Sequence, residues 1–499
     1  MHQTWNWLKL KIKLDYIWWL IIFVGIVIRL RQYLLDLSLS TEEAALALNV
    51  VTRTFSGLTQ PLNFEVGGPI AFLFIEKLFF IVLGTNDLVP RIFPLLSGLL
   101  AIYLFYRIAR KHFGIAGLFA LFAFAISPWM TYYTSYFRPY SSDVTVALLL
   151  LYLSELCLSE KVRTGDFLLL GIAGIVAIWI SNPSVFILAG TGLVVAFQKW
   201  LRKDYVHFGW SVIMGCIWIV TFGINYIFSL RHLVADSYLH GYWLSTFMPF
   251  PPWNNPRWFW DTYLSFLSKS LIRTDLIFAL GCFLLILVGC VSFFARERAI
   301  ALFMISPFAV TLAASALQRY PFEDQFILFL IPFVYLFMTE GLGRIYSFLA
   351  KWNRPIALIT YGIIFLIVLK PAVGTATRNF VYPSRSWDLR PVIEHVVNNY
   401  RAGDTFYISG GGQIFNYYAE IYGLNTNNAI LRNTHRIVGR WTFENDLRSL
   451  AGKNRVWVIF AYFEDPNIQS YIRDLHQDAT ITDTFQSWDA RAYLINIYP

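Results

Sequence analysis

The segment Ser38-Leu-Ser-Thr-Glu-Glu-Ala-Ala-Leu-Ala-Leu-Asn49 follows the first long apolar stretch of the chain and carries two adjacent acids, Glu42 and Glu43. The small and apolar residues after these acids predict a helix that runs from Glu42 to Phe55. A carboxylate close to hydrocarbon is unfavourable unless water, a partner or a function holds it there. The segment therefore indicates polar chemistry at the surface of a membrane.

The composition of the whole chain is that of an integral membrane protein. Of the 499 residues, 57% are hydrophobic and 18% are aromatic, and the mean hydropathy is +0.52, well above the values of soluble domains. Apolar runs long enough to cross about 30 Å of hydrocarbon occur about eleven times. They lie at 16–35, 88–109, 114–133, 140–158, 166–182, 183–200, 208–230, 274–295, 298–316, 325–347 and 354–372. The division between 166 and 200 depends on a turn at Ser181-Asn-Pro-Ser184, because Asn-Pro favours turn initiation.

The distribution of basic residues predicts the orientation of the chain. Lys and Arg are concentrated near 9–13, 107–111, 161–163, 199–203, 296–298 and 344–354, which are alternate loops. Because cytoplasmic loops are enriched in Lys and Arg, we expect a multi-pass protein of the plasma (inner) membrane with a cytoplasmic N-terminus. The loops at 36–87, 134–140, 231–273 and 317–324 then face outward. The formal net charge of +9 is scattered over these membrane-flanking loops, so it does not indicate a nucleic-acid partner.

The chain changes character after about residue 373, where the apolar spans stop. Short runs typical of strands, at 405–409, 455–460 and 490–497, alternate there with helical patterns at 388–400, 412–423, 441–452 and 466–476, as in an α/β domain. We therefore predict a multi-spanning α-helical domain over 1–372 and a small extracytoplasmic α/β domain over 373–499. Within the first outer loop, the helix expected from Glu42 to Phe55 has an apolar stripe typical of a helix that lies in the membrane interface. Pro69–Leu83 is short for a span and predicts a second interfacial or half-inserted helix.

Three of the outward segments carry charges at the ends of spans. They are Glu42-Glu43 with Glu65, then 132–143, then 318–325. A carboxylate suits a general base, and guanidinium groups suit an anionic lipid phosphate. The alternative is interfacial decoration, because aromatic belts and long basic side chains are common at membrane surfaces. Asp143 could orient an acceptor, assist Glu42, bind a divalent metal or pair structurally with a hydroxyl.

Short motifs recur in order along the outward loops and the spans that flank them. They are Glu42-Glu43-Ala44, Gln60-Pro61-Leu62, Gly67–Phe72, Glu76-Lys77-Leu78, Arg91–Leu95, Tyr132-Tyr133, Arg138–Asp143 and Tyr320-Pro-Phe322. Together they resemble the GT-C class of multi-spanning glycosyltransferases, in particular the bacterial family-39-like branch related to protein O-mannosyltransferases and lipid A aminoarabinose transferase. The resemblance covers most of the membrane domain.

The resemblance implies an inverting transfer of a sugar from a polyprenyl-phosphate donor to an envelope glycan, lipid or protein, in contact with membrane lipid. Glu42 stands where the family has its catalytic base, although the family usually has Asp there. Arg138 is the first choice for the lipid phosphate. The full set of expected substrate-binding residues is Glu43, Glu65, Arg91, Arg138, Tyr140, Asp143 and Arg319. No cofactor is certain, and a divalent metal is possible.

This chain departs from the family pattern at two further places. Tyr136 stands where the family often has an acid, and Gln325 stands where it tends to have Arg. These departures leave open a non-catalytic relative that binds lipid-linked glycans or scaffolds envelope assembly. A transporter is a third alternative, which the clustering of acids at one surface disfavours.

Overall fold

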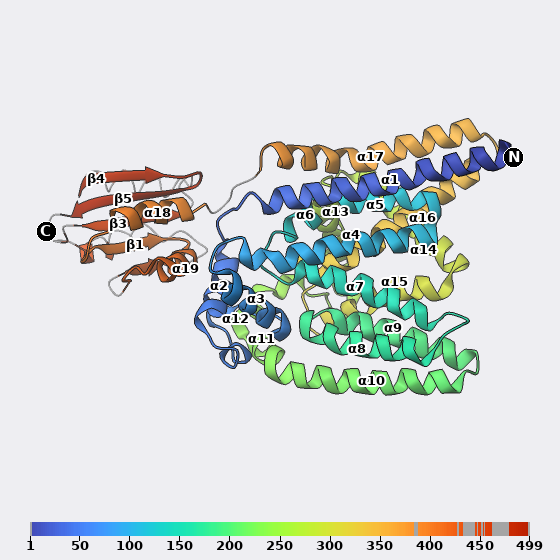
Figure 1. Ribbon diagram of the computed structural model, residues 1–499, viewed down its shortest axis with the longest axis horizontal. Coiled ribbons are helices and arrows are strands. Elements are labelled where there is room, and N and C mark those ends of the chain that lie inside the picture. Colours follow the sequence, from blue (N-terminus) through green and yellow to red (C-terminus); the bar gives the residue numbers. More distant parts are fainter. Residues whose placement is uncertain are drawn as a thin grey trace.

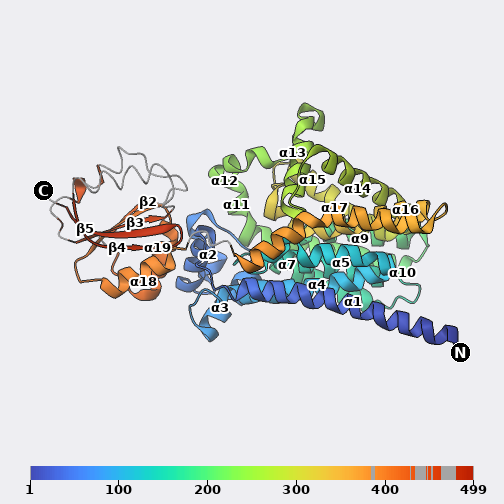
Figure 2. The ribbon, with the colours of Figure 1, turned by 90° about the horizontal axis from the view of Figure 1, so that it is seen from above.

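The computed structural model describes residues 2–383, 388–426, 429–432, 445–446, 448–450, 453, 455–461 and 479–497. A bundle of long helices forms one part of the protein, and a small α/β domain forms the other (Figure 1). The N-terminus lies at the end of the bundle that is far from the α/β domain, in both views (Figures 1 and 2). We call the opposite end of the bundle, which faces the α/β domain, the domain end.

The long apolar segments predicted from the sequence are all helical. They correspond to α1 (His2–Tyr33), α4 (Ile92–Phe113), α5 (Gly117–Ile126) with α6 (Pro128–Tyr133), α7 (Tyr140–Cys157), α8 (Thr164–Ile180), α9 (Ser184–Leu201), α10 (Tyr205–Asn225), α14 (Leu276–Arg296), α15 (Arg298–Ala316), α16 (Ile331–Leu349) and α17 (Arg354–Val381). Within the described part of the chain, nine helical stretches are long and apolar enough to cross a membrane. One of these nine, Val89–Ile126, contains both α4 and α5, and α8 is a shorter apolar helix.

Two details of the helical segments bear on the predictions. The turn between α8 and α9 is present, and the Ser184 backbone N–H donates to the Ser181 carbonyl at 3.2 Å. The last helix, α17, continues to Val381 and so passes the predicted end at residue 372. The hydropathy falls in this last stretch, but the next proline after Pro371 is Pro383, just beyond the end of the helix, so no proline interrupts the chain between residues 372 and 381.

Two glycines allow helices α14 and α16 of the bundle to approach each other closely. A Cβ atom on Gly289 of α14 would lie 1.8 Å from the Phe337 carbonyl oxygen, and one on Gly341 of α16 would lie 2.1 Å from the Leu285 carbonyl oxygen. Membrane helices commonly use such small residues to bring their backbones together. The α14–α16 pair therefore depends on the absence of side chains at these two positions.

The connecting segments between the long helices are short helices. At the domain end they include α2 (Thr41–Thr52), η1 (Gly57–Thr59), η2 (Asn63–Glu65), α3 (Ile70–Leu83) and η3 (Val89–Arg91). Later in the chain they are η4 (Gly114–Ala116), η5 (Tyr226–Leu230), α11 (Arg231–Ala235), α12 (Ser237–Tyr242), η6 (Leu244–Thr246), η7 (Pro252–Asn254), α13 (Pro256–Ser270) and η8 (Asp324–Leu330). The helix predicted over 42–55 is thus α2, and it begins one residue earlier and ends at Thr52.

The α/β domain is built on a five-stranded sheet with the order β2-β1-β3-β5-β4. Its elements are α18 (Arg390–Asn399), β1 (Thr405–Ser409), α19 (Gly412–Tyr422), β2 (Ile430–Arg432), β3 (Val456–Ala461), β4 (Ala479–Gln486) and β5 (Ala490–Ile497). Strand β1 is parallel to β2 and β3, whereas β5 is antiparallel to β3 and β4. The predicted strands at 405–409, 455–460 and 490–497 are confirmed, and β2 and β4 were not predicted. The predicted helix at 466–476 and most of the one at 441–452 lie outside the described residues.

Helix α2 joins the two parts of the protein, because it lies between the bundle and the sheet (Figures 1 and 2). Its buried side chains, among them Ala44 and Leu46, share one hydrophobic core with Phe72 of α3 and with Tyr418 of α19. The same core extends to Trp457 in the central strand β3. The α/β domain is therefore packed directly onto the helix that carries the two acids.

We predict that Gly289→Ala lowers the thermal unfolding temperature of the detergent-solubilised protein, because the new methyl group overlaps the Phe337 carbonyl. Overpacking of this kind typically costs about 1–3 kcal/mol. The matched control is Gly281→Ala on the same helix, where a Cβ atom meets nothing within 4 Å. Equal unfolding temperatures for the two variants would contradict the packing described for α14 and α16.

Candidate active site

The N-terminus of α2 sets the directions of the two acids. The Ser40 hydroxyl accepts the Glu43 backbone N–H at 3.4 Å, and the Glu43 carboxylate accepts the Ser40 backbone N–H at 3.0 Å. This reciprocal arrangement is a capping box, and it satisfies two N–H groups that have no partner within the helix. Successive helical residues point about 100° apart, so Glu43 turns inward while Glu42 points elsewhere.

Glu43 lies in a buried ion pair with Arg91. The Arg91 Nε and Nη2 atoms donate to the two carboxylate oxygens at 3.0 and 2.9 Å, and the side chains are only 5% and 2% exposed. Arg91 also donates to the carbonyls of Leu37 and Ser38 at 2.6 and 3.3 Å. The pair therefore holds the segment that enters α2, in the bidentate geometry that is strongest for arginine and carboxylate.

The same carboxylate also holds the second segment of the site. The Phe137 backbone N–H donates to Glu43 Oε1 at 2.8 Å. Phe137 lies between Tyr136 and Arg138 in the short loop that connects α6 to α7. One buried carboxylate thus fixes the position of the α2 N-terminus relative to this loop.

Glu42 lies at the surface, next to the side chains of that loop. Its carboxylate is 47% exposed and lies 3.5 Å from Arg138 Nη2. The Tyr136 hydroxyl donates to the same carboxylate oxygen at 3.5 Å and accepts the Ser40 hydroxyl at 3.0 Å. Burial, followed by the nearby Glu42 carboxylate, raises the pKa of Tyr136 well above its ordinary value, so the phenol stays protonated and remains a donor.

Arg138 is buried but only partly used by the protein. Its Nη1 donates to the Gly67 carbonyl at 3.2 Å, and its Nε is buried with no hydrogen-bond partner among the described residues. Burial lowers the pKa of Arg138, but Tyr140 and Glu42 outweigh that effect and leave it above its ordinary value. The guanidinium is therefore a fixed, charged group with donor capacity to spare.

Two further predicted residues, Tyr140 and Asp143, lie at the start of α7, which follows Arg138. Tyr140 begins α7 and interacts electrostatically with Arg138, Glu42 and Asp143. Asp143 is buried one turn further on, and its Oδ1 has no hydrogen-bond partner in the part of the chain that is described. The structure thus brings Glu42, Arg138 and Tyr140 together, and Asp143 lies one turn further along α7.

The other predicted residues have different surroundings. Glu65 is exposed in η2, where it and Phe64 have positive φ angles of 55° and 67°. Arg319 is exposed beyond the end of α15, and across the described chain no ion pair joins it to Glu42. Substrate contacts by these two residues, and by all the other residues of the predicted set, stay predictions. Within the described ranges, no group of three or more His, Cys, Asp and Glu side chains is placed to hold a metal ion.

Two cavities lie beside the Glu42–Arg138 pair. One of about 130 Å³ is lined by Ser40, Arg91 and Tyr136 together with residues of α1 and α17. A second of about 220 Å³ is lined by Glu65, Gly67 and Gly68 together with residues of η5 and α11. Because Tyr136 and Gly67 both contact the Glu42–Arg138 pair, each cavity adjoins the candidate site.

Two contacts of the site were not predicted from the sequence. In the sequence, Tyr136 is only a departure from an expected acid, and its bond to Glu42 requires the folded loop. The role of Ser40 had a local signal, because Ser three residues before Glu is the signature of a capping box. In the third charged outward segment, 318–325, the Gln325 side chain accepts a hydrogen bond from the Tyr133 hydroxyl at 3.4 Å.

Comparisons with known proteins agree with this architecture. Residues 67–222 match the family described as dolichyl-phosphate-mannose-protein mannosyltransferase. No curated protein sequence matches the chain. The solved structure of ArnT from Cupriavidus metallidurans in the apo state is similar, with a TM-score of 0.52, 13% sequence identity and coverage of 99% of this chain and 98% of ArnT.

Two ligand-bound structures are also similar. ArnT from Cupriavidus metallidurans bound to undecaprenyl phosphate has a TM-score of 0.53 at 12% identity, with coverage of 95% of this chain and 97% of ArnT. The archaeal oligosaccharyltransferase AglB from Archaeoglobus fulgidus, in complex with an inhibitory peptide and a dolichol-phosphate, has a TM-score of 0.50 at 12% identity. The match covers 96% of this chain and 74% of AglB. These similarities establish the fold.

We expect Glu43→Gln to lower the thermal unfolding temperature strongly, because it leaves the Arg91 charge buried without a carboxylate. Removing one partner of a buried ion pair costs about 3–5 kcal/mol. The double variant Glu43→Gln with Arg91→Gln should be less destabilised than the sum of the two single variants. Glu160→Gln, at an exposed acid between α7 and α8, is the control, and a Glu43→Gln protein as stable as this control would show that the pair is not structural.

Proposed function

From the GT-C membrane glycosyltransferase fold of this chain, we propose that it is an inverting glycosyltransferase. It moves a sugar from a polyprenyl-phosphate donor to an envelope glycan, lipid or protein. The observation that carries the proposal is the half-exposed Glu42 carboxylate beside the buried, incompletely paired Arg138 guanidinium. The family that matches residues 67–222 is named for dolichyl-phosphate mannose, and the ArnT and AglB structures contain polyprenyl phosphates.

Arg138 is the group that receives the donor phosphate. Negative charge accumulates on the phosphate as its bond to the sugar breaks, so a fixed guanidinium stabilises the transition state more than the ground state. Arg138 is held in place by the Gly67 carbonyl and is only 7% exposed. Its buried Nε atom, without a partner in the described chain, is a donor suited to a phosphate oxygen.

Glu42 is the general base. The acceptor hydroxyl loses its proton to the Glu42 carboxylate while its oxygen forms a bond to the anomeric carbon. The bond from that carbon to the phosphate oxygen breaks on the opposite face, so the configuration inverts and polyprenyl phosphate leaves. Because an alcohol is a weak acid, deprotonation is concerted with attack and depends on positioning. Tyr136 orients the carboxylate through its hydroxyl.

The site lies on the outer face of the plasma membrane in this proposal. The basic residues of the predicted cytoplasmic loops support that orientation, because they lie at the far end of the bundle from the α/β domain. Arg110 and Lys111 close α4 there, Arg296 closes α14, and Arg354 opens α17. The enrichment of Lys and Arg on the cytoplasmic side then places the N-terminus inside the cell and the α/β domain outside.

One observation favours the second candidate, a non-catalytic relative that binds lipid-linked glycans or scaffolds an envelope assembly. The Glu42 carboxylate is already engaged by the Arg138 guanidinium at 3.5 Å and by the Tyr136 hydroxyl, and a buried guanidinium can bind a phosphate without any transfer. Binding and turnover must therefore be measured separately.

We predict that Glu42→Gln lowers the rate of sugar transfer by at least about 10²-fold, because the amide cannot accept the acceptor proton. The assay uses purified protein in micelles with a labelled polyprenyl-phosphate sugar, and thermal unfolding checks the fold. Glu160→Gln, far from the site, should transfer at the rate of the unmodified protein. Full turnover by Glu42→Gln would remove Glu42 as the base.

A binding experiment separates the two candidate functions. Arg138→Gln should weaken the binding of polyprenyl phosphate by about tenfold or more, because a charge-assisted hydrogen bond contributes about 1.5–3 kcal/mol. Glu42→Gln should bind it at least as tightly as the unmodified protein, because a competing negative charge is gone. Binding without turnover in the unmodified protein would support the non-catalytic candidate, and unchanged binding by Arg138→Gln would exclude Arg138 as the phosphate site.

A further inference from the structure

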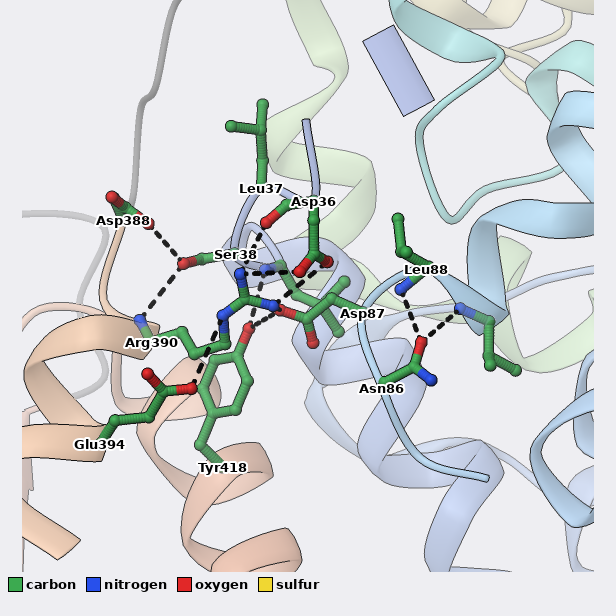
Figure 3. Close-up of polar contacts among 12 residues, drawn as sticks. Asp36, Leu37, Ser38, Asn86, Asp87, Leu88, Asp388, Arg390, Glu394 and Tyr418 are labelled. Atoms are coloured by element: carbon green, nitrogen blue, oxygen red, sulfur yellow. Dashed lines mark hydrogen bonds and ion pairs between the residues drawn. The ribbon is translucent and has the colours of Figure 1, made fainter. Parts of the chain in front are cut away.

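The segment that leads into α2 is held from two sides. On the bundle side, Arg91 donates to the carbonyls of Leu37 and Ser38. On the other side, the Ser38 hydroxyl donates to Asp388 Oδ1 at 2.7 Å and accepts the Arg390 backbone N–H at 3.2 Å (Figure 3). These two partners belong to the α/β domain, about 350 positions later in the chain.

Tyr418 of α19 also contacts the backbone of this segment. Its hydroxyl accepts the Leu39 backbone N–H at 3.1 Å and donates to the buried Asp87 carboxylate (Figure 3). Burial raises the pKa of Tyr418 well above its ordinary value, so the hydroxyl stays protonated and can make both contacts. Leu39 is immediately followed by Ser40, the cap of α2, so this bond lies three residues before Glu42.

Asp87 depends on the α/β domain for its partners. It is only 2% exposed, and it receives hydrogen bonds from Tyr418 and from Arg390 Nη1, the latter at 2.9 Å. Arg390 Nη2 also donates to the Asp36 carbonyl at 2.6 Å. Burial raises the pKa of Asp87 to about 6 even though Arg390 opposes the effect. Without the α/β domain this carboxylate would lose the hydrogen bonds from both Tyr418 and Arg390 and would stay buried without them.

We infer that the α/β domain positions the catalytic segment, with Tyr418 as a positioning residue that holds the chain at Leu39 and so sets the place of Glu42. This inference rests on the proposed function, and it gives the α/β domain a role within the reaction of the same site. Displacing a reacting group by about 1 Å can cost about 10²-fold in rate. A hydroxyl that fixes the backbone three residues from the base therefore acts on turnover.

The variant that tests this inference is Tyr418→Phe, which keeps the aromatic ring and removes the hydroxyl. The matched control is Tyr422→Phe, one turn later on α19, whose hydroxyl donates to the exposed side chain of Glu394 at 3.0 Å. We expect Tyr418→Phe to lower kcat by about tenfold or more while the KM for the donor changes by less than about twofold. Tyr422→Phe should retain both values.

Two further readouts distinguish positioning from a general loss of structure. The first is kcat per polyprenyl-phosphate binding site, because partial unfolding reduces the number of sites and not the turnover of each. The second is hydrogen exchange of the amides over residues 36–43 in the full-length protein, which should become faster in Tyr418→Phe and not in Tyr422→Phe. If Tyr418→Phe does not fold, Ser38→Ala, which removes the hydroxyl between Asp388 and Arg390, is assessed in the same way.

The outcomes separate this inference from the proposed function. Unchanged kcat per site in Tyr418→Phe overturns the positioning role, whatever the exchange shows. If the unmodified protein transfers no sugar from any donor, the proposed function fails, and exchange over 36–43 decides alone. Faster exchange in Tyr418→Phe then supports the role of Tyr418 in fixing the backbone of residues 36–43, and unchanged exchange overturns that role.

Discussion

The candidate site depends on one buried carboxylate. Glu43 accepts hydrogen bonds from Arg91, from the Phe137 backbone and from the Ser40 backbone. It thereby joins the entry to α2, the start of α4 and the loop before α7, which are distant in the sequence. Every other feature of the site follows from this junction, because the same loop carries Tyr136 and Arg138 and the same helix carries Glu42. A buried ion pair contributes little net stability, but it permits few alternative arrangements.

The two neighbouring acids have opposite environments because of helix geometry. Residues that are adjacent in a helix point about 100° apart, so burying Glu43 leaves Glu42 at the surface beside a cation. The α/β domain completes the arrangement from the other side, through Tyr418, Arg390 and the core that it shares with α2. A carboxylate held in this way can meet a substrate in a defined geometry, which is what an inverting transfer at a membrane surface requires.

Much of the fold could be predicted from local patterns. The long apolar segments and the strands β1 and β3 could be predicted because their burial leaves continuous apolar runs in the sequence. The turn before Ser184 could be predicted from its Asn-Pro pair. Strand β4 was not predicted, because it is an edge strand whose exposed polar positions alternate with positions that are only partly buried, and β2 has only three residues. The spacing of Ser40 and Glu43 indicates a capping box, but the burial of Glu43 against Arg91 could not be predicted from it, since the two residues are 48 positions apart. The contact between Leu39 and Tyr418 spans 379 positions, beyond the reach of any local signal.

The central claim is that Glu42 and Arg138 form the reacting centre for a lipid phosphate. A cryo-electron microscopy structure of the protein with bound polyprenyl phosphate tests it most directly. The account predicts phosphate oxygens within hydrogen-bonding distance of the Arg138 guanidinium, with the Glu42 carboxylate facing the space that the sugar would occupy. A phosphate bound elsewhere, with the Glu42–Arg138 contact intact, would contradict it.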